Sequence, residues 1–374
     1  MKFLQILGVL CCLFESALGS IGAEPRVAFL AIRKFDGWAS RSDVPGGQGR
    51  VWTSPWVEAG HGFDEMVLSW NVKDAWSNSG FQFQVQIMDS NQPSGWFHLG
   101  KWSLNTNVFP RQSVTDTKNP VGHVDTDTLK LVSPAQRYRL QLLVEPSASL
   151  ELASDPPLRS LGVSTLNSRT SHIPRPEFRE AWGMRLVVPE LSQHAYQGGH
   201  VWCSPSSLTM LLAYWGDTLG RNDLRINIPE AARSVFDPVY GGTGNWSFNT
   251  AFAGSFPGLE GYVIRLRDLS DLESLVSQRL PVAVSVSLGL LRGRGKERDD
   301  GHLVVLRGFD QLGNPWVNDP DATHPPTSIK PVLRLYQRDH LLKAWATSQR
   351  TVYVLTPTTQ RIEGLLGMNS PFSP

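Results

Sequence analysis

Apolar and polar residues alternate along much of the first half of the chain. The clearest run is FQFQVQIMD, residues 81–89, in which glutamines take one face of a predicted strand. The opposite face carries Phe81, Phe83, Val85 and Ile87. Turn-forming clusters such as SDVPGG and SNQPSG separate further alternating runs, including EMVLSWNV and RYRLQLLVEP. This pattern is typical of an antiparallel β-sandwich, which we predict at residues 26–165, followed by a linker at 166–180.

The second half combines helical and strand-like patterns. In WCSPSSLTMLLAYWG, residues 202–216, apolar residues recur at helical spacing and Gly216 is placed to end the helix. A second helix is predicted in LSDLESLVSQRLP, where Ser270 and Glu273 have capping-box spacing. Strand-like runs follow, including VAVSVSL, HLVVLRGFD, NPWVNDP and TVYVLTP. We predict an α+β domain at 181–358 and a poorly ordered tail at 359–374.

Composition and charge exclude several classes of partner. The chain of 374 residues has 35 Lys+Arg against 34 Asp+Glu, and the basic residues are scattered. A protein without a basic stripe is not expected to bind nucleic acid or an anionic membrane surface. No close pairing of histidines suggests a metal site, because His194 and His200 fit loop positions better, and no cofactor is expected.

The first 23 residues are typical of a secretory signal peptide. Lys2 precedes an apolar stretch that is too short to span a bilayer, and cleavage after Gly19 or Ala23 would leave a small residue at the cut. We therefore expect a secreted or periplasmic protein without a membrane span. Removal of this segment would leave Cys203 as the single cysteine, so that it is either a reactive thiol or a small buried residue.

The surroundings of Cys203 favour a thiolate. A proline in the first turn fixes the start of the predicted helix at Cys203, where free N–H groups and the helix dipole stabilise an anion. A nearby protonated histidine would lower the pKa of the thiol further.

His302 is the candidate base, because it opens an apolar strand of a predicted hairpin. If the loop of this hairpin has an even number of residues, Asp319 lies on the same face as His302. An odd loop would instead leave Asn318 as the nearer partner. Same-face placement would allow a cysteine-histidine-acid mechanism, whereas the alternative is an ordinary hairpin with polar ends.

Two glutamines upstream, Gln193 and Gln197, could each stabilise an oxyanion together with the backbone N–H of Cys203. Substrate contacts are predicted at Trp202, Asn245 and Trp246. The Gly- and aromatic-rich stretch 241–258 could equally be a loop and a short helix packed by its aromatic residues. The charged stretch 291–301 is a candidate lid, although a solvated loop explains it as well.

Taken in order, the glutamine, WCSPSSLTMLLAYWG, PVAVSVS, GHLVVLRGFD and PWVNDP resemble the papain-like cysteine peptidases. Within them, the stretch 185–357 is most similar to the branch related to the double-glycine-leader peptidases that process bacteriocins. The resemblance implies a papain-like fold with Cys203 as nucleophile, His302 as base and Asp319 as orienting acid. VPELSQ points to Gln193 as the oxyanion residue, although Gln197 has the six-residue spacing of papain-like enzymes.

The chain also departs from that branch. It has no ABC-transporter segments, and the usual CG after the nucleophile is CS. The sequence therefore predicts a stand-alone secreted cysteine peptidase that acts on a peptide or protein substrate. A cysteine amidase or acyltransferase acting on a cell-wall amide would use the same residues, and a binding protein with an inactive domain is a further alternative. The Trp-rich sandwich could bind carbohydrate or a cell-wall polymer.

Overall fold

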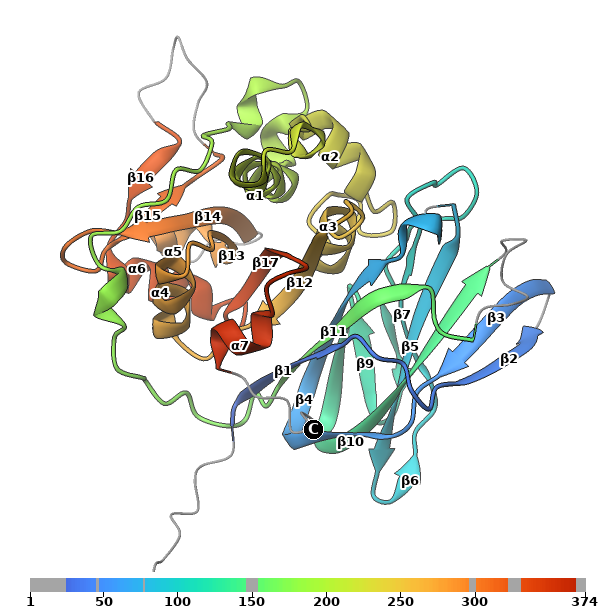
Figure 1. Cartoon of the computed structure of the whole chain (residues 1–374). Helices are drawn as coiled ribbons and strands as arrows, with labels where there is room; N and C mark the ends of the chain where they lie inside the picture. Colours follow the sequence, from blue (N-terminus) through green and yellow to red (C-terminus); the bar gives the residue numbers. More distant parts are fainter. Residues whose placement is uncertain are drawn as a thin grey trace, which may run out of the picture.

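The computed structural model describes residues 25–44, 47–76, 78–145, 154–295, 301–321 and 331–367. The predicted signal peptide and residues 296–300 of the candidate lid lie outside this range. Two domains lie side by side, a strand-rich one and one that mixes helices and strands (Figure 1). No helix in the described ranges is sufficiently long and apolar to cross a membrane.

The N-terminal domain is built from antiparallel strands. The elements are β1 Val27–Ile32, β2 Ala39–Val44, β3 Gly47–Thr53, β4 Val57–Val72, the 3-10 helix η1 Asp74–Trp76, β5 Gly80–Asp89, β6 Gln92–Pro93, β7 Phe97–Trp102, β8 Asp116–Asn119, β9 Gly122–Asp125, β10 Thr128–Glu145 and β11 Leu158–Leu166. Hydrogen bonds connect the 11 strands into one sheet along the path β1-β11-β4-β10-β3-β2. Strands β5 and β9 branch from β10, β6 and β7 pair with β5, and β8 pairs with β9.

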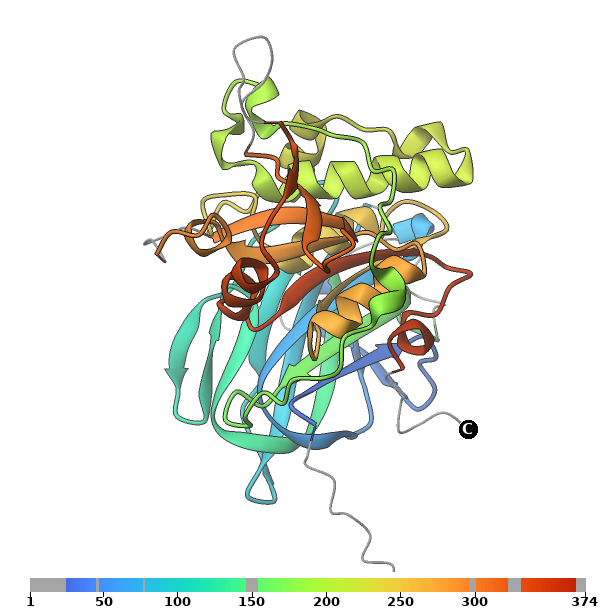
Figure 2. The same cartoon turned by 90° about the vertical axis from the view of Figure 1, so that its left-hand side faces the viewer.

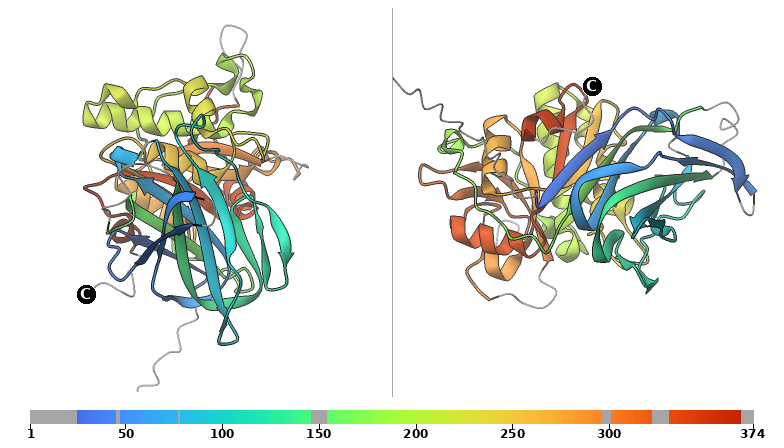
Figure 3. Two further views of the ribbon diagram at one scale, coloured as in Figure 1. Left: turned by 90° about the vertical axis from the view of Figure 1, so that its right-hand side faces the viewer. Right: turned by 90° about the horizontal axis from the view of Figure 1, so that it is seen from below.

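This connectivity differs from the two separate sheets that we expected of a sandwich. Strand β10 explains the difference, because it pairs with β4 and β9 near its start and with β3 and β5 near its end. Its register with β4 shifts on both sides of Ala135, next to Pro134, which cannot donate to a ladder. The two ends of β10 thus belong to different groups of strands and join them into one sheet. The long strands are strongly curved (Figure 3).

The core of this domain confirms the predicted alternation. The apolar face of β5 is buried, and so are most apolar residues of β4 and β10, whereas Val132 of β10 is exposed. Trp52, Trp70 and Trp102 are fully buried, so they pack in the core and are not exposed platforms for a sugar. Trp56 and Trp96 are half-buried and flank the guanidinium of Arg139, which lies 4.9 Å and 5.3 Å from their ring centroids.

The C-terminal domain has the mixed α/β composition expected from the sequence. Its elements are the 3-10 helices η3 Arg179–Ala181, η4 Gln193–Ala195, η5 Gly199–Val201 and η6 Asn222–Leu224, the helices α1 Cys203–Leu219, α2 Ile228–Val235, α3 Trp246–Ala253, α4 Leu269–Ser277, α5 Leu288–Leu291, α6 Arg338–Ala346 and α7 Ile362–Leu366, and the strands β12 Leu259–Arg265, β13 Val282–Ser287, β14 Gly301–Phe309, β15 Pro315–Asn318, β16 Leu333–Leu335 and β17 Thr351–Pro357. The strands form an antiparallel sheet in the order β12-β17-β13-β14-β15-β16. Helix α1 lies on one face of it, whereas α4 and α6 lie on the other (Figure 2).

Three local predictions in this domain were wrong. Helix α1 does not end at Gly216 but continues to Gly220, which has a φ of 66° and donates its N–H to the Gly216 carbonyl. Gly216 is small for another reason, because a Cβ there would come within 2.9 Å of the Arg221 carbonyl oxygen. The expected poorly ordered tail contains α7, whose Ile362 and Leu366 are buried.

The N-terminus of α4 also differs from the predicted capping box. Asp268 caps the helix by accepting from the N–H of Leu269, and Glu273 is a buried carboxylate instead. Glu273 accepts from the N–H of Phe178 and from the indole of Trp182. The expected linker is therefore tied down to α4.

Candidate active site

The thiol of Cys203 lies at the first turn of α1. Trp202 precedes it without a side-chain cap, so the helix leaves its first N–H groups available. Pro205 follows within this turn, and the Ser207 hydroxyl donates to the carbonyl of Leu303, 3.1 Å away. This contact fixes the start of α1 against β14, next to His302.

His302 is buried and contacts both of the other candidate residues. Its Nε2 lies 2.8 Å from Oδ1 of Asp319. Its imidazole also forms a side-chain hydrogen bond with the thiol of Cys203. The structure thus brings the predicted nucleophile, base and acid together.

The hairpin that joins β14 to β15 reaches this arrangement by an unexpected route. Its loop, residues 310–314, is odd in length, which by itself would turn Asp319 to the opposite face. A register shift at Arg307 compensates, since Gly308 pairs with Trp316 whereas Val305 pairs with Asn318. Asp319 therefore returns to the face of His302. Asn318 points the other way and donates to the carbonyls of Val188 and Pro189.

The charges of the three groups stabilise one another. Burial opposes a charge on His302, but hydrogen bonds with Asp319 and Cys203 outweigh it and raise the pKa of His302 to about 10. Burial likewise opposes a thiolate, yet the hydrogen bond and charge of His302 lower the pKa of Cys203. The pKa of Asp319 is also lowered despite burial, mainly by His302. These shifts favour a thiolate on Cys203 beside an imidazolium on His302.

Gln193 and Gln197 occupy different environments. Gln193 is buried and lies on the wall of the same cleft as Cys203, and its Nε2 donates to the carbonyl of His200 at 2.8 Å. Nε2 carries a second hydrogen beyond this contact. Gln197 is exposed and does not line the cleft. Gly199 permits this packing, because a Cβ there would come within 1.8 Å of the Gln193 carbonyl oxygen.

The cleft that contains Cys203 has a volume of about 840 Å³. Asn245 and Trp246 line it, as predicted for substrate contacts, whereas Trp202 does not. Trp202 is half-buried and lies instead beside Gly198 and Gly199, so its contact with a substrate stays a prediction. Asn245 is almost fully buried and caps α3 by accepting from the N–H of Phe248. Its amide is therefore occupied by the protein itself.

Comparison with protein families gives two matches. Residues 185–352 match the model of the Peptidase_C39 like family, and residues 45–165 match the model described as Peptidase C39 N-terminal domain. The C-terminal half of the chain is thus similar to the C39-like peptidase family, and the N-terminal half to the N-terminal domain described for C39 peptidases. The resemblance inferred from the sequence is thereby confirmed, and the C39-like domain contains all three residues of the cysteine, histidine and acid arrangement.

Among solved structures, this chain matches a crystal structure from Bacillus anthracis that is named as a C39-like peptidase. The two share 15% sequence identity, and the match covers 50% of this chain and 99% of the other. With a TM-score of 0.33, this likeness carries no argument of its own. A search of curated proteins found no match.

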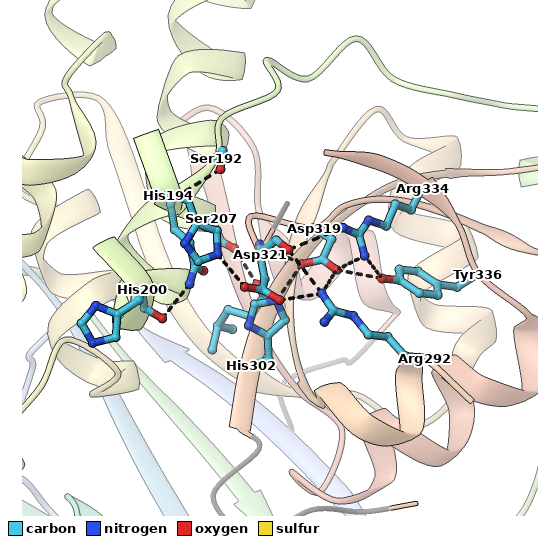
Figure 4. Close-up of polar contacts among 12 residues, drawn as sticks. Ser192, His194, His200, Ser207, Arg292, His302, Asp319, Asp321, Arg334 and Tyr336 are labelled. Atoms are coloured by element: carbon cyan, nitrogen blue, oxygen red, sulfur yellow. Dashed lines mark hydrogen bonds and ion pairs between the residues drawn. The ribbon is translucent and has the colours of Figure 1, made fainter. Parts of the chain in front are cut away.

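Sequence reasoning missed the residues that hold the acid of the C39-like domain (Figure 4). Oδ2 of Asp319 accepts from Arg292 at 3.0 Å and from the Tyr336 hydroxyl at 2.7 Å, and Arg334 lies 3.1 Å away. Arg334 and Tyr336 come from β16 and its edge, the neighbour of β15. An arginine and a tyrosine two residues apart next to the acid-bearing strand were the signal that could have revealed them.

A second set of contacts connects Asp319 with the segment of Gln193. Arg292 also binds Asp321 at 2.7 Å, and the other carboxylate oxygen of Asp321 lies 2.7 Å from Nε2 of His194 (Figure 4). The N–H of Gln193 donates to the carbonyl of Pro320. The 3-10 helix η4 is thus held beside the acid. No group of three or more His, Cys, Asp or Glu in the described ranges could hold a metal ion.

Proposed function

We propose that this C39-like protein is a cysteine peptidase that hydrolyses peptide bonds through Cys203, His302 and Asp319. One observation carries the proposal: a thiol at a helix start shares a hydrogen bond with a buried histidine, which in turn binds a buried carboxylate at 2.8 Å. The lowered pKa of the thiol and the raised pKa of the imidazole match the needs of a nucleophile and a proton donor.

The reaction would proceed by acyl transfer. The thiolate of Cys203 attacks the carbonyl carbon, and the oxyanion accepts from the Gln193 amide and the backbone N–H of Cys203. The imidazolium of His302 then gives its proton to the leaving amine as the carbon–nitrogen bond breaks, which leaves a thioester. Water attacks this thioester while His302 takes its proton, and the acid product and the thiolate are released. Asp319 holds the ring and stays ionised.

Labelling tests the nucleophile. We expect a peptidyl electrophile to modify Cys203 near neutral pH, with the adduct mapped by mass spectrometry. In the His302→Ala variant, labelling should slow by about two orders of magnitude, because the thiol loses its base. Wild-type protein that is folded but shows no adduct at Cys203 would contradict the proposal.

Cleavage of a peptide library then separates a peptidase from an enzyme that acts on other amides. We expect cuts by the wild type and none by Cys203→Ala. Turnover of a cell-wall amide without any cut peptide would replace our proposal with the amidase or acyltransferase alternative. No turnover of either, despite labelling, would favour a binding protein.

We also propose that the protein is exported, because residues 1–23 read as a signal peptide. N-terminal sequencing of the protein recovered outside the cytoplasm should begin at Ser20 or Glu24. Recovery of the intact N-terminus in the cytoplasm alone would contradict this.

A further inference from the structure

The cleft that contains Cys203 extends onto the N-terminal domain. One of its walls is formed by polar residues of β4, β9, β10 and the turn between β9 and β10. These residues are Glu65, Asp125, Thr126, Thr128 and Lys130. The C39-like domain therefore forms only part of the surface that surrounds the thiol.

The strand register explains why these residues face the same way. Thr128 pairs with Asp125 across the β9–β10 hairpin, and Lys130 pairs with Glu65 on β4. Paired residues of antiparallel strands, and residues two apart on one strand, share a face. The polar residues thus form one contiguous patch that faces the cleft.

Contacts across the domain boundary fix this wall relative to the thiol. Asp127, in the turn between β9 and β10, accepts from Nδ2 of Asn245 at 2.7 Å. On the other side of the patch, Glu65 forms an ion pair with Arg265 of β12. Both contacts join residues more than 100 positions apart. The patch is therefore held in place at both sides, as a substrate-binding surface requires.

Two opposite charges of this wall remain accessible to a substrate. Nζ of Lys130 lies 2.7 Å from Oδ2 of Asp125, and the two side chains are 38% and 50% exposed. By contrast, Glu65 and Arg265 are 15% and 2% exposed and bind each other. Lys130 keeps two ammonium hydrogens beyond this contact, and Oδ1 of Asp125, which accepts from the Thr126 hydroxyl at 3.4 Å, has a second lone pair for a further donor.

We propose that the β9–β10 hairpin is part of the substrate-binding surface and that Asp125 and Lys130 balance each other's charge there, so that neither sign of charge is preferred on the peptide side chain that lies against them. This inference rests on the proposed peptidase function. In the wild type the two charges largely balance, so the enzyme accepts side chains of either sign at this position. Removal of one partner leaves the other unbalanced and creates a preference.

The two variants should therefore change the cleavage profile in opposite directions. In Asp125→Asn, the free ammonium of Lys130 should raise kcat/KM for peptides with an acidic side chain at one position, relative to a basic one, by about threefold. In Lys130→Met, the free carboxylate should favour basic side chains by a similar factor. The profiles are measured by mass spectrometry on a peptide library with the full-length protein, and higher salt should shrink both effects.

The chain offers a matched control pair. Glu58 and Arg137 form an exposed ion pair on β4 and β10, with Nε and Oε1 2.6 Å apart, but neither lines the cleft. Glu58→Gln and Arg137→Met should retain the wild-type profile. Alkylation of Cys203 by iodoacetamide reports the thiolate separately from peptide binding.

Each outcome has one meaning. Opposite shifts in the two cleft variants, with unchanged controls, support the inference. Wild-type profiles in both cleft variants would overturn it while leaving the peptidase intact, and so would shifts matched by equal changes in alkylation rate. No cleavage by the wild type would overturn the proposed function and, with it, this inference.

Discussion

Replacement of Asn245 by aspartate tests how the two domains are held together. The amide of Asn245 donates to Asp127 at 2.7 Å and to Asp237 at 3.1 Å, so one side-chain nitrogen satisfies two carboxylates. Both carboxylates are buried. Burial outweighs the hydrogen bonds that Asp127 accepts and raises its pKa to about 6, so that it is ionised at neutral pH but costly to keep so.

The size of the expected loss in the free energy of unfolding follows from the two hydrogen bonds that an aspartate at position 245 cannot donate. A hydrogen bond to a charged group contributes about 1.5 to 3 kcal/mol, so removal of two should lower the free energy of unfolding by about 3 to 6 kcal/mol at pH 7.5. At pH 5, a proton taken up by one carboxyl supplies a new donor, and the destabilisation should fall to about half. The aspartate variant should therefore be destabilised more at pH 7.5 than at pH 5.

The sign of this pH dependence can be checked by linkage. A carboxyl whose pKa is raised in the folded state keeps a proton that the unfolded chain has already released. Stability is then highest below the unfolded pKa of about 4 and falls as the pH rises through the folded value. Urea unfolding at pH 5 and pH 7.5, followed by tryptophan fluorescence, measures the destabilisation at each pH.

A double variant provides the control. In Asp127→Asn with Asn245→Asp, the number of carboxylates is that of the wild type, and residue 127 can donate to residue 245. This variant should recover about half of the lost stability, since Asp237 still faces a carboxylate. A destabilisation below about 1 kcal/mol at both pH values, or no recovery in the double variant, would refute the reasoning.

Three further predictions concern the reaction. Because the pKa of Cys203 is lowered and that of His302 is raised, the rate of alkylation by iodoacetamide should fall less from pH 8 to pH 6 in the wild type than in His302→Ala; a wild-type rate that follows that of an ordinary thiol would contradict the ion pair. Gln193→Ala should lower kcat by about 100-fold, and Gln197→Ala should leave it unchanged; the reverse result in steady-state assays would exchange the two roles. Tyr336→Phe removes one hydrogen bond to the carboxylate of Asp319 and should lower kcat/KM by about threefold to tenfold without changing Tm by more than a few degrees. An unchanged kcat/KM would argue against a positioning role of Tyr336.

Local pattern was sufficient to predict most strands and the longest helix, because alternation and helical spacing follow directly from which face is buried. It was insufficient at the helix ends. Gly216 and Ser270 looked like end signals, yet the first is small because the chain passes close to it and the second lies inside α4. End signals are short, and a residue that is small or polar for another reason imitates them.

The relative placement of His302 and Asp319 was predicted only under a condition that the loop does not meet. The loop is odd, and the irregularity at Arg307 restores the register. The side chain of Arg307 explains what stabilises this irregularity, because it donates to the Leu186 carbonyl and to Asn318. The Leu186 partner is distant in sequence, so the hairpin alone gives no sign of it.

The face that joins the two domains was the main feature hidden in the sequence. Ser69 and Asn71 alternate with apolar residues on β4, which is the pattern of a strand with one face in water. The structure buries both, and Asn71 exchanges hydrogen bonds with the backbone of Gly261. Short polar side chains satisfy water and a partner backbone equally well, so pattern cannot distinguish an exposed face from a polar interface.

That interface changes how the N-terminal domain is understood. Phe248 of α3 packs against Trp102 with a ring separation of 5.4 Å, and Ser247 donates to the carbonyl of Leu68. A freely attached binding module would need neither contact, because such modules join through linkers with few contacts across the boundary. Here the contacts surround the same helix that begins at the cleft. The N-terminal sheet is therefore a structural part of the cleft that contains Cys203, and its contribution has to be measured in the full-length chain.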